Sequence, residues 1–287
     1  MRKQIYDVYS PSGFHWVGNG FKSNNYDIPQ TVIKKLLDPF LMIGLAPPKA
    51  FEPTEKQRGV GSHPHAGFET VTLVYEGELA HADSAGNRGV LREGGVQWMT
   101  AGRGLMHEEF HSADFSRQGG VLSMSQLWVN LPKSLKKIDP AYQDIEPEAI
   151  PSVELSGGLR IRVIAGEYAG LKGPASTHTP IRILDISILA DREAVLDIPL
   201  DHNTSAIIIT GNASILGRSV SAEDIVLFDR GGSTLDISAE EDSRIILLSG
   251  LPIEEPIVQY GPFVASSQED LMSIFKDFES GKMGSLS

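Results

Sequence analysis

The sequence predicts an all-β protein with two similar halves and a helix near its C-terminus. Short runs of β-branched and aromatic residues recur along the chain, and glycine-containing turns separate them. Many short strands with regular turns are typical of a β-sandwich or a β-barrel, and the pattern leaves both open. The clearest runs lie at 70–75, 161–164, 183–188, 206–210, 225–228 and 245–248.

A polar, proline-containing stretch separates the two halves. Residues 133–155 have the composition of a long connection. Beyond it, residues 208–228 repeat the order strand, glycine turn, strand, acidic turn and strand that residues 74–99 show. Duplication and chance similarity between two β-meanders both explain this repeat. We expect a first domain over 1–132, a connecting segment over 133–155 and a second domain over 156–287.

A helix is predicted inside the second domain. Ser266 and Glu269 have the spacing of a capping box, and Gly281 suits the end of the helix. The apolar residues between them fall at helical intervals, so we expect the helix to pack on a barrel through one stripe. This stripe consists of Leu271, Ile274, Phe275 and Phe278.

The composition indicates a globular protein that binds neither nucleic acid nor a membrane. The net charge of −12 disfavours phosphate recognition, which depends on clusters of Lys and Arg. No apolar run approaches the roughly 20 residues of a membrane-spanning helix, and the N-terminus lacks the apolar stretch of a secretory signal. The chain has no cysteine, which excludes disulfides, thiolate metal sites and a cysteine nucleophile. We expect a cytoplasmic protein.

Two pairs of alternating residues predict a metal site in the first half. His63 and His65 flank a proline, and His107 and Glu109 flank Glu108. In an extended strand, side chains at i and i+2 point to the same face, so each pair can aim two ligands at one point. The intervening residues, Glu108 among them, then face away. Three imidazoles and one carboxylate leave coordination positions open for chemistry.

Other polar residues near these pairs have simpler interpretations. His81 is expected to lie exposed in a hairpin. His111 shares the direction of the second pair, so it either lines the mouth of the cavity or lies at the surface end of a strand. Gln97 and Met99 share one face of a strand and are candidates for lining the pocket. In the second half His202 stands alone, with no His-x-His pair, so we expect no metal there.

The segments around these residues identify a known family by resemblance. They are 63–71, 97–104, 107–109, 127–132, 142–143 and 261–264. Together they resemble the pirin family of the cupin superfamily, including its quercetin 2,3-dioxygenase-type members. The resemblance implies two tandem cupin barrels (a bicupin), with one mononuclear metal in the N-terminal barrel. It also implies that the metal ligands are His63, His65, His107 and Glu109.

Glu69 is the alternative carboxylate ligand. Many cupins take their carboxylate from a His-x-His-x3-Glu pattern, and Glu69 follows His65 at that spacing. The Glu69 side chain shares the face of His63 and His65 only if the strand runs unbroken from His65. We expect Glu109 instead, because it pairs with His107 and because the pirin pattern places the ligand there. Glu69 then either supports the ligands from behind or has a structural role.

The resemblance favours iron, and the donor chemistry agrees. Imidazole and carboxylate ligands suit Fe(II), which we expect, and they also admit Mn, Co, Ni, Cu or Zn. Mg and Ca prefer shells made only of oxygen atoms.

The resemblance implies an oxygen-dependent enzyme, with two alternatives. Some pirins cleave quercetin with O2 to a depside and carbon monoxide, so we expect a dioxygenase whose metal binds the 3-hydroxyl of a flavonol. Glu109 is then both a ligand and the catalytic base for the hydroxyl proton. Other pirins are regulators, so the first alternative is an iron-binding, redox-sensing protein that binds a transcription factor or a metabolic enzyme. The second is a cupin enzyme that acts on another small ligand.

Overall fold

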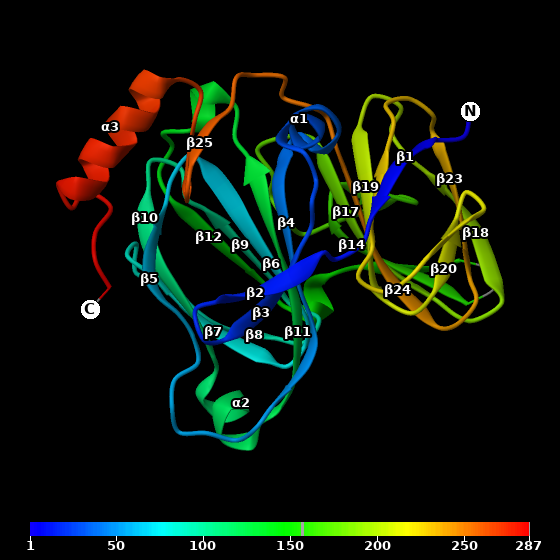
Figure 1. Ribbon diagram of the computed structural model, residues 1–287, viewed down its shortest axis with the longest axis horizontal. Coiled ribbons are helices and arrows are strands. Elements are labelled where there is room, and N and C mark those ends of the chain that lie inside the picture. Colours follow the sequence, from blue (N-terminus) through cyan, green and yellow to red (C-terminus); the bar gives the residue numbers. More distant parts are fainter. Residues whose placement is uncertain (156–157, 287) are drawn as a thin grey trace. The chain divides into compact units, whose positions relative to one another are not determined.

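Antiparallel β-sheets dominate the computed structural model, which describes residues 1–155 and 158–286 (Figure 1). The six runs expected to be strands all lie within observed strands, which confirms the all-β prediction. Among the described residues, no helix is long and apolar enough to cross a membrane.

The chain divides into two units whose bounds differ from the expected domains. We call one the N-terminal barrel, which contains Phe14–Asn25, Phe40–Pro147 and the chain from Ile253 onward. We call the other the C-terminal barrel, which contains Met1–Gly13, Tyr26–Pro39 and Glu148–Pro252. The two ends of the chain are thus exchanged relative to the expected ranges 1–132 and 156–287. The reason is strand pairing between residues that are far apart in the sequence, which local patterns do not reveal.

Two sheets build the N-terminal barrel. One has the order β12 (Ala141–Ile145), β9 (Val96–Thr100), β6 (Phe68–Glu76), β11 (Gly120–Asn130) and β4 (Phe40–Phe51). The other has the order β5 (Gly59–His65), β10 (Leu105–His111), β7 (Glu78–Asp83) and β8 (Arg88–Arg92). The hairpin β2 (Gly13–Val17) and β3 (Phe21–Asn25), the helix α2 (Ala113–Gln118) and the hairpin β25 (Val258–Tyr260) and β26 (Phe263–Ala265) complete it. The expected connecting segment therefore supplies a strand, β12, after a 3-10 turn at Lys133–Leu135.

The interior of the N-terminal barrel is apolar at the end near α2 and polar further along the strands. Side chains of β3, β4, β6, β7, β8, β11 and α2 form the apolar cluster. It consists of Phe21, Ala46, Val74, Leu79, Leu91, Phe115, Leu122 and Met124. The next inward-facing positions on β6, β7 and β11 are Thr72, His81 and Gln126. The histidine pairs therefore lie beyond a layer of hydrocarbon that fixes the sheets.

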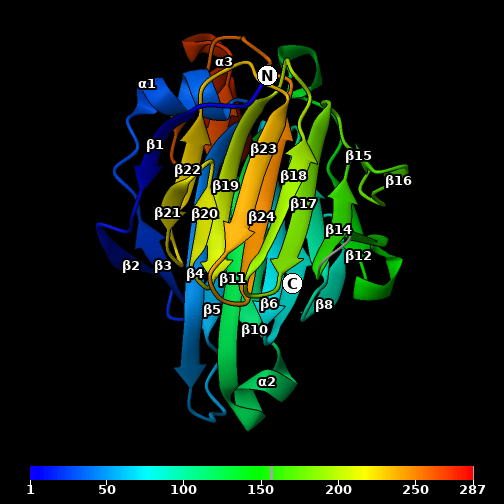
Figure 2. The same ribbon diagram turned by 90° about the vertical axis from the view of Figure 1, so that its right-hand side faces the viewer.

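The C-terminal barrel has the same kind of architecture (Figure 2). One sheet has the order β1 (Ile5–Tyr9), β22 (Ile225–Phe228), β19 (Asn203–Thr210), β24 (Ser243–Gly250), β17 (Ile181–Ile188), β14 (Leu159–Ala165) and β13 (Ser152–Leu155). The other has the order β18 (Arg192–Asp197), β23 (Thr234–Ala239), β20 (Ala213–Ile215) and β21 (Arg218–Val220). Minor elements are the hairpin β15 (Glu167–Tyr168) and β16 (Leu171–Lys172), the helical turns Gln30–Val32 (α1) and Ile33–Leu37, and a 3-10 turn at Pro147–Ala149.

Aliphatic side chains fill the interior of the C-terminal barrel. Ile186, Ile208 and Leu247 from one sheet pack with Leu235 and Ile237 from the other, and all five are at most 3% exposed. Each such burial contributes about 1.5–3 kcal/mol relative to exposure. The expected repeat is visible as well, because β19–β22 follow one another as β6–β9 do.

The predicted C-terminal helix exists, but its cap and its unit differ from the prediction. The helix α3 spans Gln268–Glu279, and the Ser267 side chain caps it by accepting a hydrogen bond from the Asp270 backbone N–H. The cap is therefore one residue later than the expected Ser266. Leu271 is buried, and α3 packs on β25 and β26 of the N-terminal barrel rather than on the second domain (Figure 1).

Close packing of β26 explains why position 67, two residues after His65, is a glycine. The Val264 N–H donates to Ala66 O at 2.9 Å, which joins β26 to the end of β5. Gly67 has φ +86°, and a Cβ at this position would lie 1.8 Å from Val264 O. Only glycine permits this backbone conformation together with such a close approach.

Replacing Gly67 with alanine is expected to lower the free energy of unfolding of the N-terminal barrel by about 2 kcal/mol or more, since the backbone is strained and β26 must move. Trp16, Trp98 and Trp128 all belong to this barrel, so tryptophan fluorescence during urea unfolding reports on it selectively. Gly61→Ala is the matched control, because a Cβ there meets nothing within 4 Å. Equal midpoints for the two variants would contradict the prediction.

Candidate metal centre

Neighbouring strands bring the two predicted pairs together. In the antiparallel pair β5 and β10, His107 lies opposite His63 and Leu105 lies opposite His65. The register shifts between His107 and Glu109, where the β5 partner of Glu109 is Val60. The expected same-face arrangement of the histidines is therefore present, and it is built by two strands joined side by side.

Three imidazoles converge at one point inside the N-terminal barrel. Their ligand atoms all lie within 4.8 Å of one another. The ring centroids of His63 and His107 are 4.3 Å apart, and His65 lies 4.8 Å from each of them. Nε2 of His65 and Nε2 of His107 are 3.1 Å apart. Two nitrogens bonded to one ion at about 2.1 Å stand roughly 3.0 Å apart at a right angle, so this spacing fits a shared metal.

A hydrogen bond at Nδ1 of His63 orients its ring, and with it the Nε2 atom. Its Nδ1 lies 2.9 Å from Gly61 O, and a carbonyl only accepts, so Nδ1 carries the proton. Nε2 then presents its lone pair to the other two rings. Metal-binding histidines are commonly oriented in this way by a carbonyl behind the ring.

Burial keeps the inner histidines neutral. Desolvation lowers the pKa of His65 well below its ordinary value, and the neighbouring His63 lowers it further. Desolvation also lowers the pKa of His107 well below its ordinary value, and His65, His63 and His81 add to this effect. Neutral imidazoles are the form that binds metals, because the lone pair is free.

Glu109 lies beside His107. Its Oε2 is 3.9 Å from His107 Nε2, within the about 4.2 Å that separates two donors on opposite sides of one ion. Gln126 Nε2 donates to both carboxylate oxygens at 3.0 Å, and the Thr72 hydroxyl lies 3.4 Å from Oε1. The carboxylate is thus held in a fixed direction next to the imidazoles.

Glu69 belongs to the other face of its strand. His65 ends β5, and the positive φ of Gly67 separates it from β6, so the alternation does not continue from His65 to Glu69. The Thr72 side chain of β6 contacts Glu109, which places the even-numbered residues of β6 toward the histidines. Glu69 instead accepts a hydrogen bond from the Thr100 hydroxyl at 2.7 Å.

His81 is buried, which corrects the expectation that it lies exposed in a hairpin. Its side chain is 1% exposed and stacks on Tyr142, with ring centroids 4.9 Å apart and an angle of 4°. Asp83, on the same face of β7, lies next to it. Burial favours the neutral form of the Asp83 carboxyl, but the nearby His81 imidazole and the hydrogen bonds from Asn87 outweigh it and hold its pKa below the ordinary value.

His111 is also buried, at the apolar end of the barrel. Its ring packs against Phe21, Phe51 and Phe115, and Nε2 lies 3.0 Å from Gly20 O. Neither the cavity mouth nor a surface strand end describes this position, because the helix α2 and the hairpin β2–β3 enclose the end of the strand.

Aromatic and amide side chains line the barrel around the histidines. The ring centroids of Phe68 and Trp128 are 4.3 Å apart, and each ring makes an edge-to-face contact with His65. Gln97 pairs with Thr72 across β9 and β6, so it faces the same side, as expected for a pocket residue. Its amide Nε2 is buried and has no hydrogen-bond partner among the described residues.

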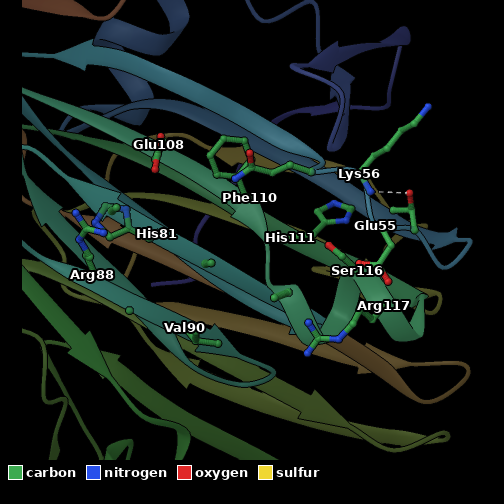
Figure 3. Close-up of a pocket in the computed structure, with 16 residues that line it drawn as sticks. Glu55, Lys56, His81, Arg88, Val90, Glu108, Phe110, His111, Ser116 and Arg117 are labelled. Atoms are coloured by element: carbon green, nitrogen blue, oxygen red, sulfur yellow. Dashed lines mark hydrogen bonds between the residues drawn. The ribbon is translucent and has the colours of Figure 1, made fainter. Parts of the chain in front are cut away.

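A hollow of about 610 Å³ lies on the outer face of the sheet that carries the histidines. Ala80, Ala82, Glu108 and Phe110 line it, and these positions alternate with the inward-facing residues of β7 and β10. Figure 3 shows Glu108 and Phe110 projecting into this hollow. Glu108 therefore faces away from the histidines, as predicted.

Models of known families match most of the chain. The model described as pirin matches residues 22–129, and the model described as the pirin C-terminal cupin domain matches residues 183–284. The first contains the histidine pairs, and the second falls mainly on the barrel with the aliphatic interior.

Individual relatives agree over the full length. A crystal structure of quercetin 2,3-dioxygenase from Acinetobacter baumannii is 41% identical, covers 100% of both chains and has a TM-score of 0.95. A Pseudomonas aeruginosa protein, whose name provisionally assigns it as a quercetin 2,3-dioxygenase, is 41% identical over 281 residues and covers 98% of both chains.

A more distant structure shares the fold alone. It is a bacterial pirin from Escherichia coli in complex with nickel(II), 22% identical, with a TM-score of 0.63 over 86% of this chain and 99% of its own. The two family matches and the full-length relatives, together with the tandem barrels, show that the chain belongs to the pirin family of two-domain cupins.

Proposed function

We propose that this pirin is a metal-dependent dioxygenase that cleaves a flavonol such as quercetin with O2. The observation that carries the proposal is the convergence of three imidazoles, with a fixed carboxylate beside His107, inside a barrel. The names of two relatives at 41% identity, both assigned to quercetin cleavage, support the same class of substrate. His63, His65, His107 and Glu109 are the proposed metal ligands.

The donor set suits a borderline divalent metal. Three imidazole nitrogens and one carboxylate oxygen are typical ligands of Fe(II), which we propose as the native metal, and of Mn, Co, Ni, Cu and Zn. The nickel(II) of the Escherichia coli pirin is bound by a protein with this fold. When bound, such a metal supplies Lewis acidity that favours the ionised form of a coordinated hydroxyl group.

Glu109 is the proposed acceptor for the proton of the flavonol 3-hydroxyl. A general base needs an acceptor atom within hydrogen-bond reach of the proton. Gln126 donates to both oxygens of Glu109 and keeps the carboxylate aimed at the space beside His107. Because those bonds come from a neutral amide, they orient the carboxylate without neutralising it.

The walls of the barrel suit a flat aromatic substrate. Phe68 and Trp128 offer apolar ring surface next to His65, and ring stacking favours planar ligands. The unpaired amide of Gln97 is a buried donor, and such a group gains most from a ligand oxygen. We propose that it donates to an oxygen substituent of the substrate.

The double variant His63→Ala with His107→Ala is expected to lose bound metal by at least tenfold relative to the wild type, since two of the four ligands are gone. Metal content of protein purified without chelator measures this. His15→Ala is the control, because His15 lies on the exposed strand β2 and bonds to Asn25. Equal metal content in all three proteins would refute the site.

Glu109→Gln is expected to weaken metal retention by roughly tenfold, and Glu69→Gln by much less, because Glu69 bonds to Thr100 on the other face of β6. Competition with a chelator gives both affinities. The opposite order would assign the carboxylate ligand to Glu69.

Incubation with quercetin in air is expected to bleach its visible absorbance and to release carbon monoxide, whereas anaerobic incubation does neither. Cleavage consumes O2 as the oxidant, so both signals must depend on it. The double histidine variant gives the background rate. A wild-type rate equal to that background rate would refute the proposed activity.

A further inference from the structure

A third same-face pair lies behind the proposed metal ligands. His81 and Asp83 alternate on β7, which pairs with β10 on the side opposite β5. In this register Asp83 lies opposite His107, and His81 lies opposite Glu109. The strand β10 thus carries its ligands between two other strands that both present histidines to it.

We propose that His81 is a positioning residue for His107, in a chain that runs from Asp83 through His81 to the Nδ1 side of His107. The proposal rests on the proposed metal site, in which Nε2 of His107 binds the ion. It assigns no ligand role to His81 or Asp83 themselves.

The ring nitrogens lie in the order that such a chain requires. Nδ1 of His107 is 3.5 Å from Nδ1 of His81, and Nε2 of His81 is 3.7 Å from Oδ2 of Asp83. Nε2 of His107 is on the far side of its ring, 3.1 Å from Nε2 of His65. Both links are longer than the about 3.0 Å of an ordinary hydrogen bond, so the order and direction of the atoms carry the inference.

With a neutral His81 between the other two groups, the protons have a single direction. An ionised carboxylate only accepts, so Nε2 of His81 carries its proton toward Asp83. A neutral His81 then has a lone pair at Nδ1, which accepts the proton of His107 Nδ1. The remaining lone pair of His107 is at Nε2, where a metal ligand needs it.

Neighbouring groups hold Asp83 and His81 in place. The backbone N–H groups of Ala85 and Asn87 donate to Oδ1 of Asp83 at 2.9 and 3.0 Å, and Asn87 Nδ2 donates to Oδ2 at 2.8 Å. Tyr142 stacks on the face of His81 and restricts rotation of the ring. Among the described residues, Asp83 is the only side chain recorded within ion-pair distance of His81 Nε2.

Packing against Tyr142 is the competing role for His81, and two substitutions separate the roles. His81→Phe keeps an aromatic ring on Tyr142 but removes both nitrogens. His81→Asn loses the stacking but places an amide oxygen near the position of Nδ1, so His107 retains an acceptor. A positioning role predicts that Asn preserves the metal site better than Phe, and a packing role predicts the reverse.

The test uses Co(II) bound to the full chain after removal of metal by chelator. Affinity comes from chelator competition, the ligand field from the visible Co(II) spectrum, and stability from urea unfolding of the apoprotein. We expect His81→Phe to bind Co(II) 10- to 100-fold more weakly with a changed spectrum, at an unfolding midpoint close to that of the wild type. We expect His81→Asn to retain most of the affinity while unfolding at lower urea.

A matched control changes another buried histidine in the same way. His111→Phe places the same ring among Phe21, Phe51 and Phe115, where we expect no change in Co(II) affinity or spectrum. An equal loss of affinity in His111→Phe and His81→Phe would overturn the proposal, because the effect would then be general.

The remaining outcomes distinguish this proposal from the proposed metal site. Wild-type affinity and spectrum in His81→Phe overturn the positioning role if the double variant of His63 and His107 loses Co(II). Wild-type Co(II) binding by that double variant overturns the metal site itself. If His81→Phe does not fold, Asp83→Asn decides: a weaker affinity supports the chain, and an unchanged affinity and spectrum overturn it.

Discussion

The register of β10 between β5 and β7 is the constraint on which the candidate site depends. Side chains alternate along a strand, so a slip of one residue would turn His107 and Glu109 to the outer face and Glu108 inward. The observed register sets His107 opposite both His63 and Asp83. At one end of the barrel, His111 of β10 packs against Phe21 and Phe115 of the apolar cluster, and Val60 of β5 packs against the same cluster. The apolar layer therefore fixes the polar one.

Alternation explains what the sequence could predict and where it failed. The His63–His65 and His107–Glu109 pairs were recognisable because each lies within one unbroken strand. His81 and Asp83 show the same i and i+2 signal on β7, but a hairpin read without its neighbours appears solvated. Only the pairing of β10 with β7 and the stacking of Tyr142 from β12 reveal that the hairpin is covered. Glu69, the alternative ligand, shows the limit of this signal, since the alternation ends at Gly67, where a positive φ interrupts the strand.

Pairing between distant segments also limited the prediction of domains. The six clearest strands and the C-terminal helix follow from local pattern, and all of them are present. The assignment of the chain ends to the two barrels does not follow from local pattern, because it depends on the pairing of β1 with β22 and on the bond from β26 to Ala66. The helix cap was displaced by one residue for a local reason. Ser266 and Ser267 are adjacent, and Asp270 at the third position from Ser267 competes with Glu269 at the third position from Ser266.

Comparison of the two barrels indicates that this architecture does not need a polar interior in order to fold. Both barrels have the same succession of strands, and the C-terminal one fills its interior with Ile186, Ile208, Leu235 and their neighbours. Apolar side chains are therefore sufficient to fill a barrel of this kind. Burying imidazoles and a carboxylate in their place costs stability unless these groups are paired. The N-terminal barrel bears this cost at His65, His107 and Glu109, and the Gln126 amide offsets part of it by donating to Glu109. Groups that the fold does not need for packing are thus the ones to which the proposed function assigns a role.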